Sequence, residues 1–543
     1  MKRLPLVTVV ALLAAAVVIT VGFAAGAPGS SPRPSDNPAA RGGSTPPPSA
    51  TASTPPVATP TPEPTPTPTP TPVPLADVPI VPVTHFRTTA DRTNRDEVQA
   101  LLAGSSERYG TLELVASEAD AILQAIGVER PADDAHLLLL PDAEALSNSL
   151  ASNRKHLGFL RAGAVGPGVR ALAWGDNAMF GVGRVKALDA WTLTAELPEE
   201  DGTAFDPAGL WTLVAGGDIL LDRGVAQTVK VNGKGVDFPF DGGTAEITGH
   251  TCCSGFGWEV PVTRRTGNGG AMRALISGAD LAIANFENPA PDRFRYHTSG
   301  TVFSADPALI EGLKNAGIDW VSLANNHIGD AGRNGILQTI DNLAEWGIKS
   351  GGAGYNASAA RRPTILEANG VKVGIIGYDS IAPGYRAGSD SAGSASFTEK
   401  NVISDVKKAR DSGAQVVIVF PHWGTEYDPT PFTGQQALAR AAIDAGADMV
   451  IGNHAHWAGA LEVYEGKPIW YALGNFIFDQ TWSEPTMEGM TLELTFDGAE
   501  LVQARMRPHI ILDKAQPNFL DPAGDGRVVM GQVFDASKGL LPW

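Results

Sequence analysis

The sequence is poor in cysteine. Only two of its 543 residues are cysteines, and these two, Cys252 and Cys253, are neighbours. A disulfide framework or a thiolate metal cage is excluded, because each needs cysteines from several parts of the chain. A disulfide between adjacent residues is geometrically unusual, so we expect two small loop residues here.

Positive charge is also scarce. The chain has 41 basic and 59 acidic residues and a formal net charge of −18. This balance argues against a nucleic-acid partner, because binding a phosphate backbone needs a basic face. An anionic substrate stays possible, since a bound metal ion can supply local positive charge. With 43% hydrophobic residues the chain can bury a sizeable core, and its length predicts about two to four folding units.

The N-terminus carries one long uncharged apolar run. Lys2 and Arg3 precede it, and it extends from Leu4 to about Ala27. This pattern predicts a signal peptide or a membrane anchor over residues 1–27. In either case the rest of the chain is expected to be extracytoplasmic, because basic residues stay on the cytoplasmic side. Ala25-Gly26-Ala27 has the small-x-small pattern of a cleavage site, but Pro28 follows it, so secretion and anchoring both remain open.

Residues 28–77 are mostly Pro, Thr, Ser, Ala and Gly and end in Thr-Pro repeats. Such a segment has almost nothing to bury, so it cannot offset the entropy lost on ordering. We predict a disordered, extended Pro/Thr-rich linker that holds the following domains away from the membrane.

Residues 78–205 read as a smaller, accessory α/β domain. Ile80–Val83 is a predicted strand, which Pro82 should confine to a sheet edge. A helix is expected over 96–102, with Asn94 as its cap and Glu97 completing a capping box. Further predicted strands are Leu112–Val115, Leu137–Leu140 and Ala171–Trp174. Part of this segment faintly resembles one lobe of a periplasmic solute-binding protein; the alternative is an accessory domain without a ligand.

Residues 209–513 hold the strongest pattern, in which apolar, strand-like runs end in polar residues able to bind metal. The runs are Thr212–Ala215, Leu281–Ala284, Trp320–Leu323, Val416–Phe420 and Met449–Ile451. They end in Gly216-Gly217-Asp218, Asn285-Phe286-Glu287, Ala324-Asn325-Asn326-His327, Pro421-His422-Trp423-Gly424 and Gly452-Asn453-His454-Ala455-His456. A sixth run, Val373–Ile376, has no such ending, and residues 514–543 are expected to be a C-terminal tail. Helical stretches such as 307–316 and 335–346 lie between the runs, which predicts an α/β domain with its chemistry at the carboxyl ends of strands.

Taken together, these endings form a mixed oxygen and nitrogen ligand set. It comprises two carboxylates, one side-chain amide and three or four imidazoles. His454 and His456 are two residues apart, so in an extended chain they would point the same way. The set suits two divalent cations that share a bridging carboxylate, an arrangement that activates water for displacement at phosphorus.

The order of these motifs resembles the CapA family, linked to poly-γ-glutamate capsule synthesis, a family similar to calcineurin-like metallophosphoesterases. The matching segments are Gly217-Asp218, Asn285-Phe286-Glu287, Ala324–His327 with Asp330 and Gly332, His422–Tyr427, Gly452–His456 and Leu473-Gly474-Asn475-Phe476. The resemblance covers roughly 300 residues in order. It implies a sandwich of two β-sheets flanked by helices, with two divalent metal ions (Mn, Fe or Zn) at one sheet edge.

The resemblance also implies a role for each matching residue. Asp218 and His456 would hold the first metal, and Glu287 would bridge. The second metal would be held by Asn326, His422 and His454.

Four further residues are candidates for catalysis or substrate binding. His327 would be the general acid, and Asp330 would orient it, with a turn or helix-cap role as the alternative for Asp330. Arg223 and Asn475 are candidate substrate contacts. The alternatives are a surface cation for Arg223 and a structural turn residue for Asn475.

The sequence departs from the wider superfamily in two places. The superfamily's first motif is Asp-x-His, whereas Asp218 is followed by Ile219-Leu220. Glu287 stands where the superfamily has a bridging Asp. The first metal is therefore expected to be weaker or more hydrated.

Two functions from different classes follow. One is a metal-dependent phosphoesterase-type hydrolase that serves capsule polymer synthesis or export, with a phosphoester or an anionic polymer as substrate. The other is a non-catalytic polymer-binding or assembly component that works with capsule-synthesis proteins. A weaker third reading is hydrolysis or transfer at a γ-glutamyl amide.

Overall fold

The structure, a computed structural model, describes residues 74–199 and 204–540. The predicted hydrophobic segment 1–27 lies outside these ranges, and so does nearly all of the predicted linker. The linker was expected to extend to residue 77, but strand β1 already begins at Leu75. Among the described residues, no helix has both the length and the apolar character needed to cross a membrane.

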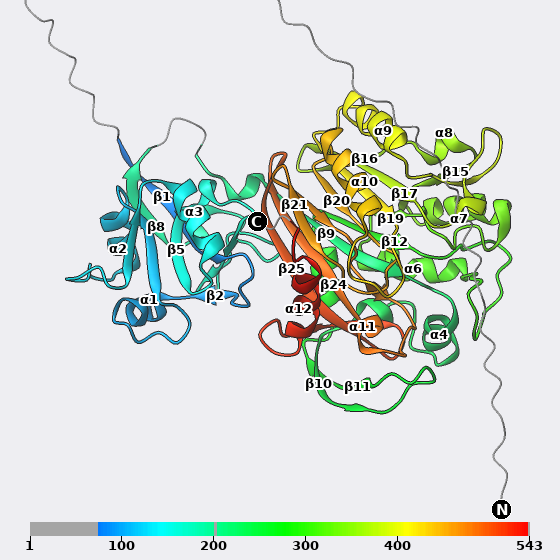
Figure 1. The fold of residues 1–543 in the computed structure, drawn as a ribbon, viewed down its shortest axis with the longest axis horizontal. Coiled ribbons are helices and arrows are strands. Elements are labelled where there is room, and N and C mark those ends of the chain that lie inside the picture. Colours follow the sequence, from blue (N-terminus) through cyan, green and yellow to red (C-terminus); the bar gives the residue numbers. More distant parts are fainter. Residues whose placement is uncertain (1–73, 200–203, 541–543) are drawn as a thin grey trace, which may run out of the picture. The chain divides into compact units, whose positions relative to one another are not determined.

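Residues 75–198 form a six-stranded sheet with helices around it (Figure 1). The sheet order is β4-β3-β5-β1-β6, with β8 also paired to β1. The strands are β1 Leu75–His85, β3 Thr111–Val115, β4 Leu137–Leu140, β5 His156–Arg161, β6 Val169–Ala171 and β8 Thr194–Pro198. The helices are α1 Arg95–Leu102, α2 Ala119–Ile126 and α3 Ala143–Ser152. The predicted strand at 171–174 is instead split between β6 and the short β7 (Ala173–Trp174).

The prediction that Pro82 lies on an edge strand is wrong. β1 pairs along one side with β5 and along the other with β8 and then β6. The β8 pairing ends at Pro79 and the β6 pairing starts at Val83. Pro82 therefore lies where the second partner changes, so the backbone donor that proline lacks costs no regular ladder bond.

Helix α1 begins as its sequence predicts. The Asn94 side-chain oxygen accepts a hydrogen bond from the Glu97 amide at 3.0 Å, a cap that contributes about 1 kcal/mol. The second half of the predicted capping box is different, because the Glu97 carboxylate accepts from the Ser106 hydroxyl.

Residues 204–540 contain two large sheets. The ten-stranded sheet has the order β11-β10-β26-β25-β24-β9-β12-β13-β14, with β23 beside β9, and the six-stranded sheet has the order β16-β17-β19-β20-β22-β21. The first sheet comprises β9 Leu210–Ile219, β10 Thr244–Thr251, β11 Val260–Gly267, β12 Leu281–Phe286, β13 Trp320–Ser322, β14 Lys349–Gly351, β23 Asn475–Ile477, β24 Glu488–Asp497, β25 Glu500–Leu512 and β26 Gln516–Leu520. The second comprises β16 Thr364–Ala368, β17 Val371–Asp379, β19 Val416–His422, β20 Met449–Ile451, β21 Leu461–Tyr464 and β22 Lys467–Trp470.

The two sheets pack face to face around a shared core. Alternate residues of each strand enter it, for example Leu213 of β9, Ile283 of β12 and Ile418 of β19. The intervening residues face helices. Those of β9 and β12 pack on α5 (Ala271–Ser277), α6 (Ile310–Ala316) and α7 (Gly332–Glu345). Those of β17 and β19 pack on α9 (Glu399–Asp411) and α10 (Thr433–Asp444). Both faces of each central strand are therefore apolar, and the expected sandwich of two sheets flanked by helices is present (Figure 1).

The predicted C-terminal tail is part of this core. β26 pairs with β25 and β10, and Val529 and Val533 of α12 (Gly526–Ala536) are buried in the core between the sheets. The turn into β26 uses Asp513 and Lys514, both with positive φ (52° and 61°). Neither residue is a glycine, so the turn has no ordinary sequence signal.

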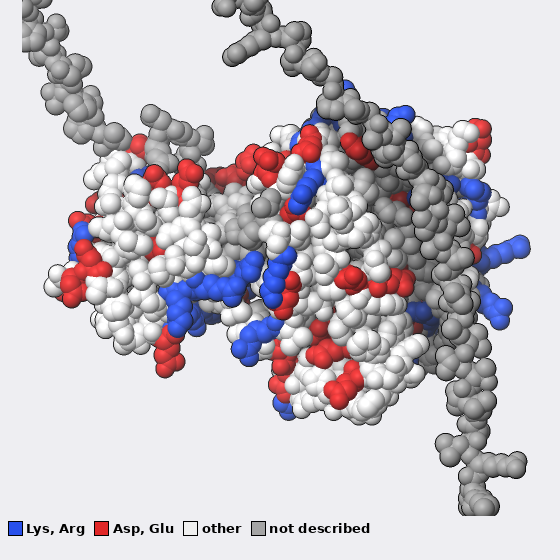
Figure 2. Space-filling view, in the orientation of Figure 1, with Lys and Arg blue, Asp and Glu red and all other residues white. Residues whose placement is uncertain are grey.

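Cys252 and Cys253 are loop residues, as expected, and their sulfur atoms are in contact. They lie between β10 and β11. On the face drawn in Figure 2, basic side chains of the described residues form small groups beside acidic ones.

Candidate metal centre

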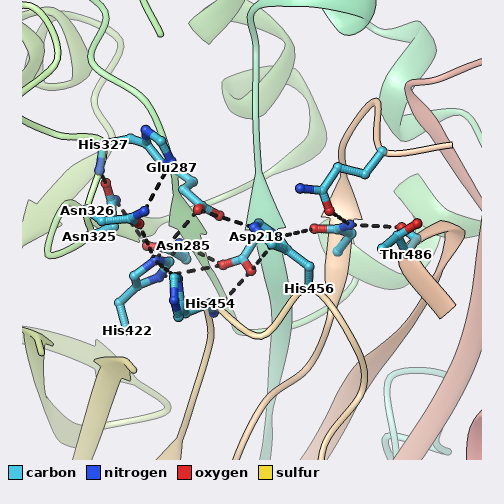
Figure 3. Close-up of polar contacts among 12 residues, drawn as sticks. Asp218, Asn285, Glu287, Asn325, Asn326, His327, His422, His454, His456 and Thr486 are labelled. Atoms are coloured by element: carbon cyan, nitrogen blue, oxygen red, sulfur yellow. Dashed lines mark hydrogen bonds and ion pairs between the residues drawn. The ribbon is translucent and has the colours of Figure 1, made fainter. Parts of the chain in front are cut away.

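Six side chains from five strand ends meet at one edge of the sandwich (Figure 3). β9, β12 and β13 are parallel neighbours in one sheet, and β17, β19 and β20 are parallel neighbours in the other. Their carboxyl ends lie together, as expected for ligand sites in parallel sheets. The residues brought together are Asp218, Glu287, Asn326, His422, His454 and His456.

Asp218 is positioned by a close approach of two backbones. Its amide donates to the Gly474 carbonyl at 3.1 Å. A Cβ at the preceding Gly217 would lie 1.9 Å from that same carbonyl oxygen, so only glycine fits there. The Asp218 carboxylate accepts from the Asn285 side chain at 2.7 Å and from the His454 amide at 3.1 Å.

Glu287 stands between two groups of possible ligands. Glu287, His422 and His454 form one group, and Asp218, Glu287 and His456 form the other. Within each group the ligand atoms lie within 4.8 Å of one another. Both carboxylate oxygens of Glu287 are buried and have no hydrogen-bond partner among the described residues. A carboxylate in this position can bridge two cations.

Asn326 and two imidazoles lie on one side of Glu287. His422 Nε2 is 2.8 Å from the Asn326 side-chain oxygen and 3.0 Å from His454 Nδ1. His422 Nε2 is also 3.6 Å from Glu287 Oε1. On the other side of Glu287, His456 Nε2 lies 3.8 Å from the same Oε1.

The backbone at His454 and His456 is not extended, which corrects the sequence argument for their alignment. Their φ angles are 94° and 57°. Non-glycine residues rarely adopt such values, and the cost persists where surrounding structure enforces it, often at functional sites. The two rings converge through these turns, with centroids 6.1 Å apart.

The electrostatics of this cluster fit a cation. Burial raises the pKa of Asp218, and burial together with the neighbouring Asp218 raises the pKa of Glu287 well above its usual value. Burial lowers the pKa of His422 well below its usual value and lowers the pKa of both His454 and His456 to about 3. Neutral imidazoles beside carboxylates that lack a basic partner are a suitable donor set for divalent metal ions.

His327 lies at the rim of the cluster. Its Nε2 is 3.2 Å from the Asn326 side-chain nitrogen, and its Nδ1 is 2.9 Å from Asp330 Oδ2. The Phe303 ring covers it, with ring centroids 4.1 Å apart. Asp330 thus contacts the second ring nitrogen of His327, as its predicted orienting role requires.

Arg223 is not a surface cation, because its side chain is only 10% exposed and forms an ion pair with Asp479. It also donates to the Gly300 carbonyl at 2.8 Å and lies over the Phe303 ring. Its proposed contact with an anionic oxygen stays a prediction.

The Asn475 side chain is not accessible to a substrate. It is fully buried, and its side-chain oxygen is 2.8 Å from His456 Nδ1. Its side-chain nitrogen donates to Gln480 and to the Thr486 carbonyl. The structural alternative is therefore the better description, with the added role of orienting His456.

Three residues near the cluster were given no role from the sequence. Asn285 binds Asp218 and lies 3.1 Å from His422 Nδ1. Tyr385 donates to the second oxygen of Asp330 at 3.1 Å. The run expected to stop at Ile376 continues to Asp379, which pairs in register with His422. The position of Asn285, two residues before Glu287 in the same motif, was a usable signal, whereas no local pattern indicates Tyr385.

Comparison with known proteins agrees with this geometry. The family model "Bacterial capsule synthesis protein PGA_cap" matches residues 212–480. Capsule biosynthesis protein CapA of Bacillus anthracis is 35% identical over 284 residues, which span 49% of this chain and 66% of that protein, just under two thirds of its length. A probable polyglutamine synthesis accessory protein of Mycobacterium tuberculosis (strain CDC 1551 / Oshkosh) is 30% identical over 284 residues, spanning 49% of this chain and 74% of that protein.

Among solved structures, a 5'-nucleotidase precursor from Thermus thermophilus aligns with 61% of this chain and 58% of its own, at 15% identity and a TM-score of 0.33. That similarity is too low to bear on fold or function. The family model, the identity to both relatives and the ordered strand-end motifs agree, and the chain belongs to the CapA family of bacterial capsule synthesis proteins.

Proposed function

We propose that this chain is an extracytoplasmic, metal-dependent hydrolase of the phosphoesterase type, with a calcineurin-like fold, that serves synthesis or export of an anionic capsule polymer. One observation carries the proposal: the unpartnered, buried Glu287 carboxylate belongs to both ligand groups. The relatives' names, capsule biosynthesis and polyglutamine synthesis accessory protein, support the polymer context. The N-terminal hydrophobic run supports placement outside the cytoplasm.

The residues divide into two metal sites. Asp218 and His456 would hold one divalent ion, and Asn326, His422 and His454 would hold the other, with Glu287 shared. Mn, Fe and Zn suit this donor set. When bound, such a pair supplies a Lewis acid and an activated water for attack at phosphorus.

The residues around the metal ligands donate a proton to the leaving group or hold another side chain in position. His327 at the rim is the general acid that protonates the leaving oxygen, and Asp330 fixes its ring through Nδ1. Phe303 lies against the His327 ring and shields that side of it from water. Asn285 holds the Asp218 carboxylate in place through a direct hydrogen bond.

The test uses the full-length protein, metal analysis and turnover of an aryl phosphate. We expect two metal equivalents per chain. Asp218→Ala should lose metal and turnover, and His327→Ala should keep metal but lose at least about 100-fold in turnover. Asp411→Asn, an exposed carboxylate on α9, is the control and should behave as the unmodified protein. Full activity in both site variants would rule out this mechanism.

A second candidate function is a non-catalytic polymer-binding or assembly component. It is favoured by the absence of a histidine after Asp218, where buried Leu220 stands instead. Metal binding without turnover of any phosphoester, together with affinity for an anionic polymer, would support this alternative. Turnover of a γ-glutamyl amide would instead support attack at an amide carbonyl.

A further inference from the structure

A cavity of about 250 Å³ is lined by arginines from both ranges of residues that the structure describes. Arg87, Arg154 and Arg170 belong to residues 74–199, and Arg527 belongs to helix α12. None of the six candidate metal ligands is among the described residues that line it. Cavities that hold drug-sized ligands usually exceed about 300 Å³, so this volume suits a compact ligand.

The four guanidinium groups outnumber the acids around them. Asp91 is the single carboxylate among the described residues that line the cavity. It already pairs with Arg505 on β25, and its Oδ1 lies 3.5 Å from Nη2 of Arg170. The other three arginines form no ion pair with any residue that the structure describes. On a chain with a net charge of −18, this local excess of positive charge is unusual.

Arg170, on β6, is the most buried of the four. The residue is 9% exposed, and the 3.5 Å contact with Asp91 is its one ion pair among the described residues. Burial and the neighbouring Arg505 lower the pKa of Arg170 to about 9, although Asp91 opposes this shift, so the group stays charged at neutral pH. A guanidinium group has five donors, and one long contact leaves donors available to a ligand.

Arg87 and Arg154 lie close enough to repel each other. Burial lowers the pKa of Arg87, and the charge of Arg154 lowers it further. Burial and the same two arginines lower the pKa of His85 to about 4, so this histidine is neutral. The Arg87 guanidinium lies over the Phe534 ring, 4.5 Å from its centroid. Such stacking uses the flat face of the group, so its N–H edge can still donate to a ligand.

We propose that this cavity binds a phosphate-type oxyanion through its four arginines. Charges of one sign around a single volume destabilise the folded chain until an opposite charge enters it. A tetrahedral oxyanion offers more acceptor oxygens than the two of a carboxylate, so it can pair with several guanidinium groups at once. The site is separate from the metal centre and does not depend on the proposed hydrolysis. Because its arginines come from residues 74–199 and from α12, the anion also stabilises the contact between them.

Calorimetric titration of the full-length protein with sodium phosphate tests the site. A chelator is present, so phosphate cannot bind through metal ions at the metal centre. We expect saturable binding by the unmodified protein, and Arg154→Gln/Arg527→Gln should weaken it at least about tenfold. Both of these side chains are exposed, so the fold tolerates their replacement. Arg293→Gln/Arg362→Gln removes two exposed arginines that do not line the cavity and is the matched control, expected to bind as the unmodified protein does.

Thermal unfolding of the same samples gives a second readout. Phosphate should raise the Tm of the unmodified protein and of the control, because a ligand that binds only the folded state stabilises it. The Tm of Arg154→Gln/Arg527→Gln should not respond to the same phosphate concentration. An equal rise of Tm in the double variant and the control would contradict the site.

Titrations with sodium glycerol phosphate and sodium acetate identify the ligand. Tighter binding of inorganic phosphate assigns the site to the free ion, whereas tighter binding of glycerol phosphate assigns it to the phosphate group of a larger molecule. Both results support the site. It would be overturned by absent phosphate binding, by equal phosphate binding in the double variant and the control, or by acetate binding as tight as that of phosphate.

Discussion

Two kinds of buried carboxylate lie in the same ten-stranded sheet. Glu493 on β24 has a side chain that is 2% exposed, and Arg507 Nε lies 2.7 Å from it. Burial alone would raise its pKa, but the Arg507 and Arg505 guanidinium groups bring the pKa of Glu493 down to about 2. Asp218 on β9 and Glu287 after β12 are equally buried, yet their pKa values are raised.

The difference lies in the partner that each carboxylate has. Glu493 has a permanent cation supplied by the chain, so its charge is satisfied by the fold alone. Asp218 and Glu287 face three imidazoles whose pKa values are lowered, so these imidazoles do not neutralise them. A carboxylate pair left in this state is explained by an external cation, and the fold holds the pair at a cost to its own stability.

Glu287→Gln should give the largest difference between the two kinds of buried carboxylate. The substitution removes the shared ligand, so we expect metal affinity to fall by more than about 100-fold. In the metal-free protein the free energy of unfolding should stay unchanged or rise, because a buried acid without a partner is replaced by a neutral amide. Metal titration and denaturant unfolding of the same metal-free samples measure both. A clear loss of stability without metal would contradict the comparison.

Glu493→Gln should have the opposite pattern. Breaking a buried ion pair leaves Arg507 without its partner, and we expect a loss of about 2–3 kcal/mol in unfolding free energy with normal metal content. Since the folded pKa of about 2 lies below the ordinary value of 4.5, this stabilisation is present above about pH 4.5 and is lost as pH falls toward 2. Unfolding curves at pH 7 and pH 3 should therefore show a smaller difference between variant and parent at the lower pH.

Much of this arrangement could be predicted from the sequence. The apolar runs before Asp218, Glu287 and His422 indicated where strands end, and parallel strands bring such ends to one edge. The ligand residues could be named because the family resemblance assigned them by their positions in motifs at or after the ends of these strands. The sandwich of two sheets flanked by helices was implied by the family resemblance rather than by the runs themselves.

What could not be predicted depends on contacts distant in sequence or on backbone angles. His454 and His456 converge because both have positive φ angles, and a histidine in the sequence does not predict such an angle. The ion pair between Arg223 and Asp479 joins residues 256 positions apart. The inclusion of β26 depends on a turn without glycine, and its pairing with β10 is equally remote in sequence.

The pH dependence of metal binding should also distinguish the carboxylates of the metal centre from Glu493. Burial raises the pKa of Asp218 to about 7, so a proton must leave the carboxylate pair when metal binds at lower pH. We expect affinity to fall by up to about tenfold per pH unit between pH 7 and pH 5. His454 and His456, with pKa values of about 3, stay neutral across that range and contribute nothing. Calorimetry in buffers of different ionisation heat counts the protons released; no release at pH 6 would contradict this account.

The smallest expected effect concerns two tyrosines that each donate to a carboxylate. Tyr385 donates to Asp330, and burial and that carboxylate raise the pKa of Tyr385, so its hydroxyl stays protonated. Tyr378 donates to Asp405, which Arg361 also holds, on the face of the six-stranded sheet that packs against α9. Tyr385→Phe should lower kcat about threefold with KM and metal content unchanged, since Asp330 keeps its contact with His327 but loses one of its fixed partners.

Tyr378→Phe is the matched control for that substitution. It removes a buried hydroxyl of the same chemistry, so we expect about 1 kcal/mol of lost stability with kcat unchanged. If the two variants lower kcat equally, the contacts from Tyr385 through Asp330 to His327 are structural. The distinction between carboxylates that stabilise the fold and carboxylates that serve the chemistry would then apply only to the metal ligands.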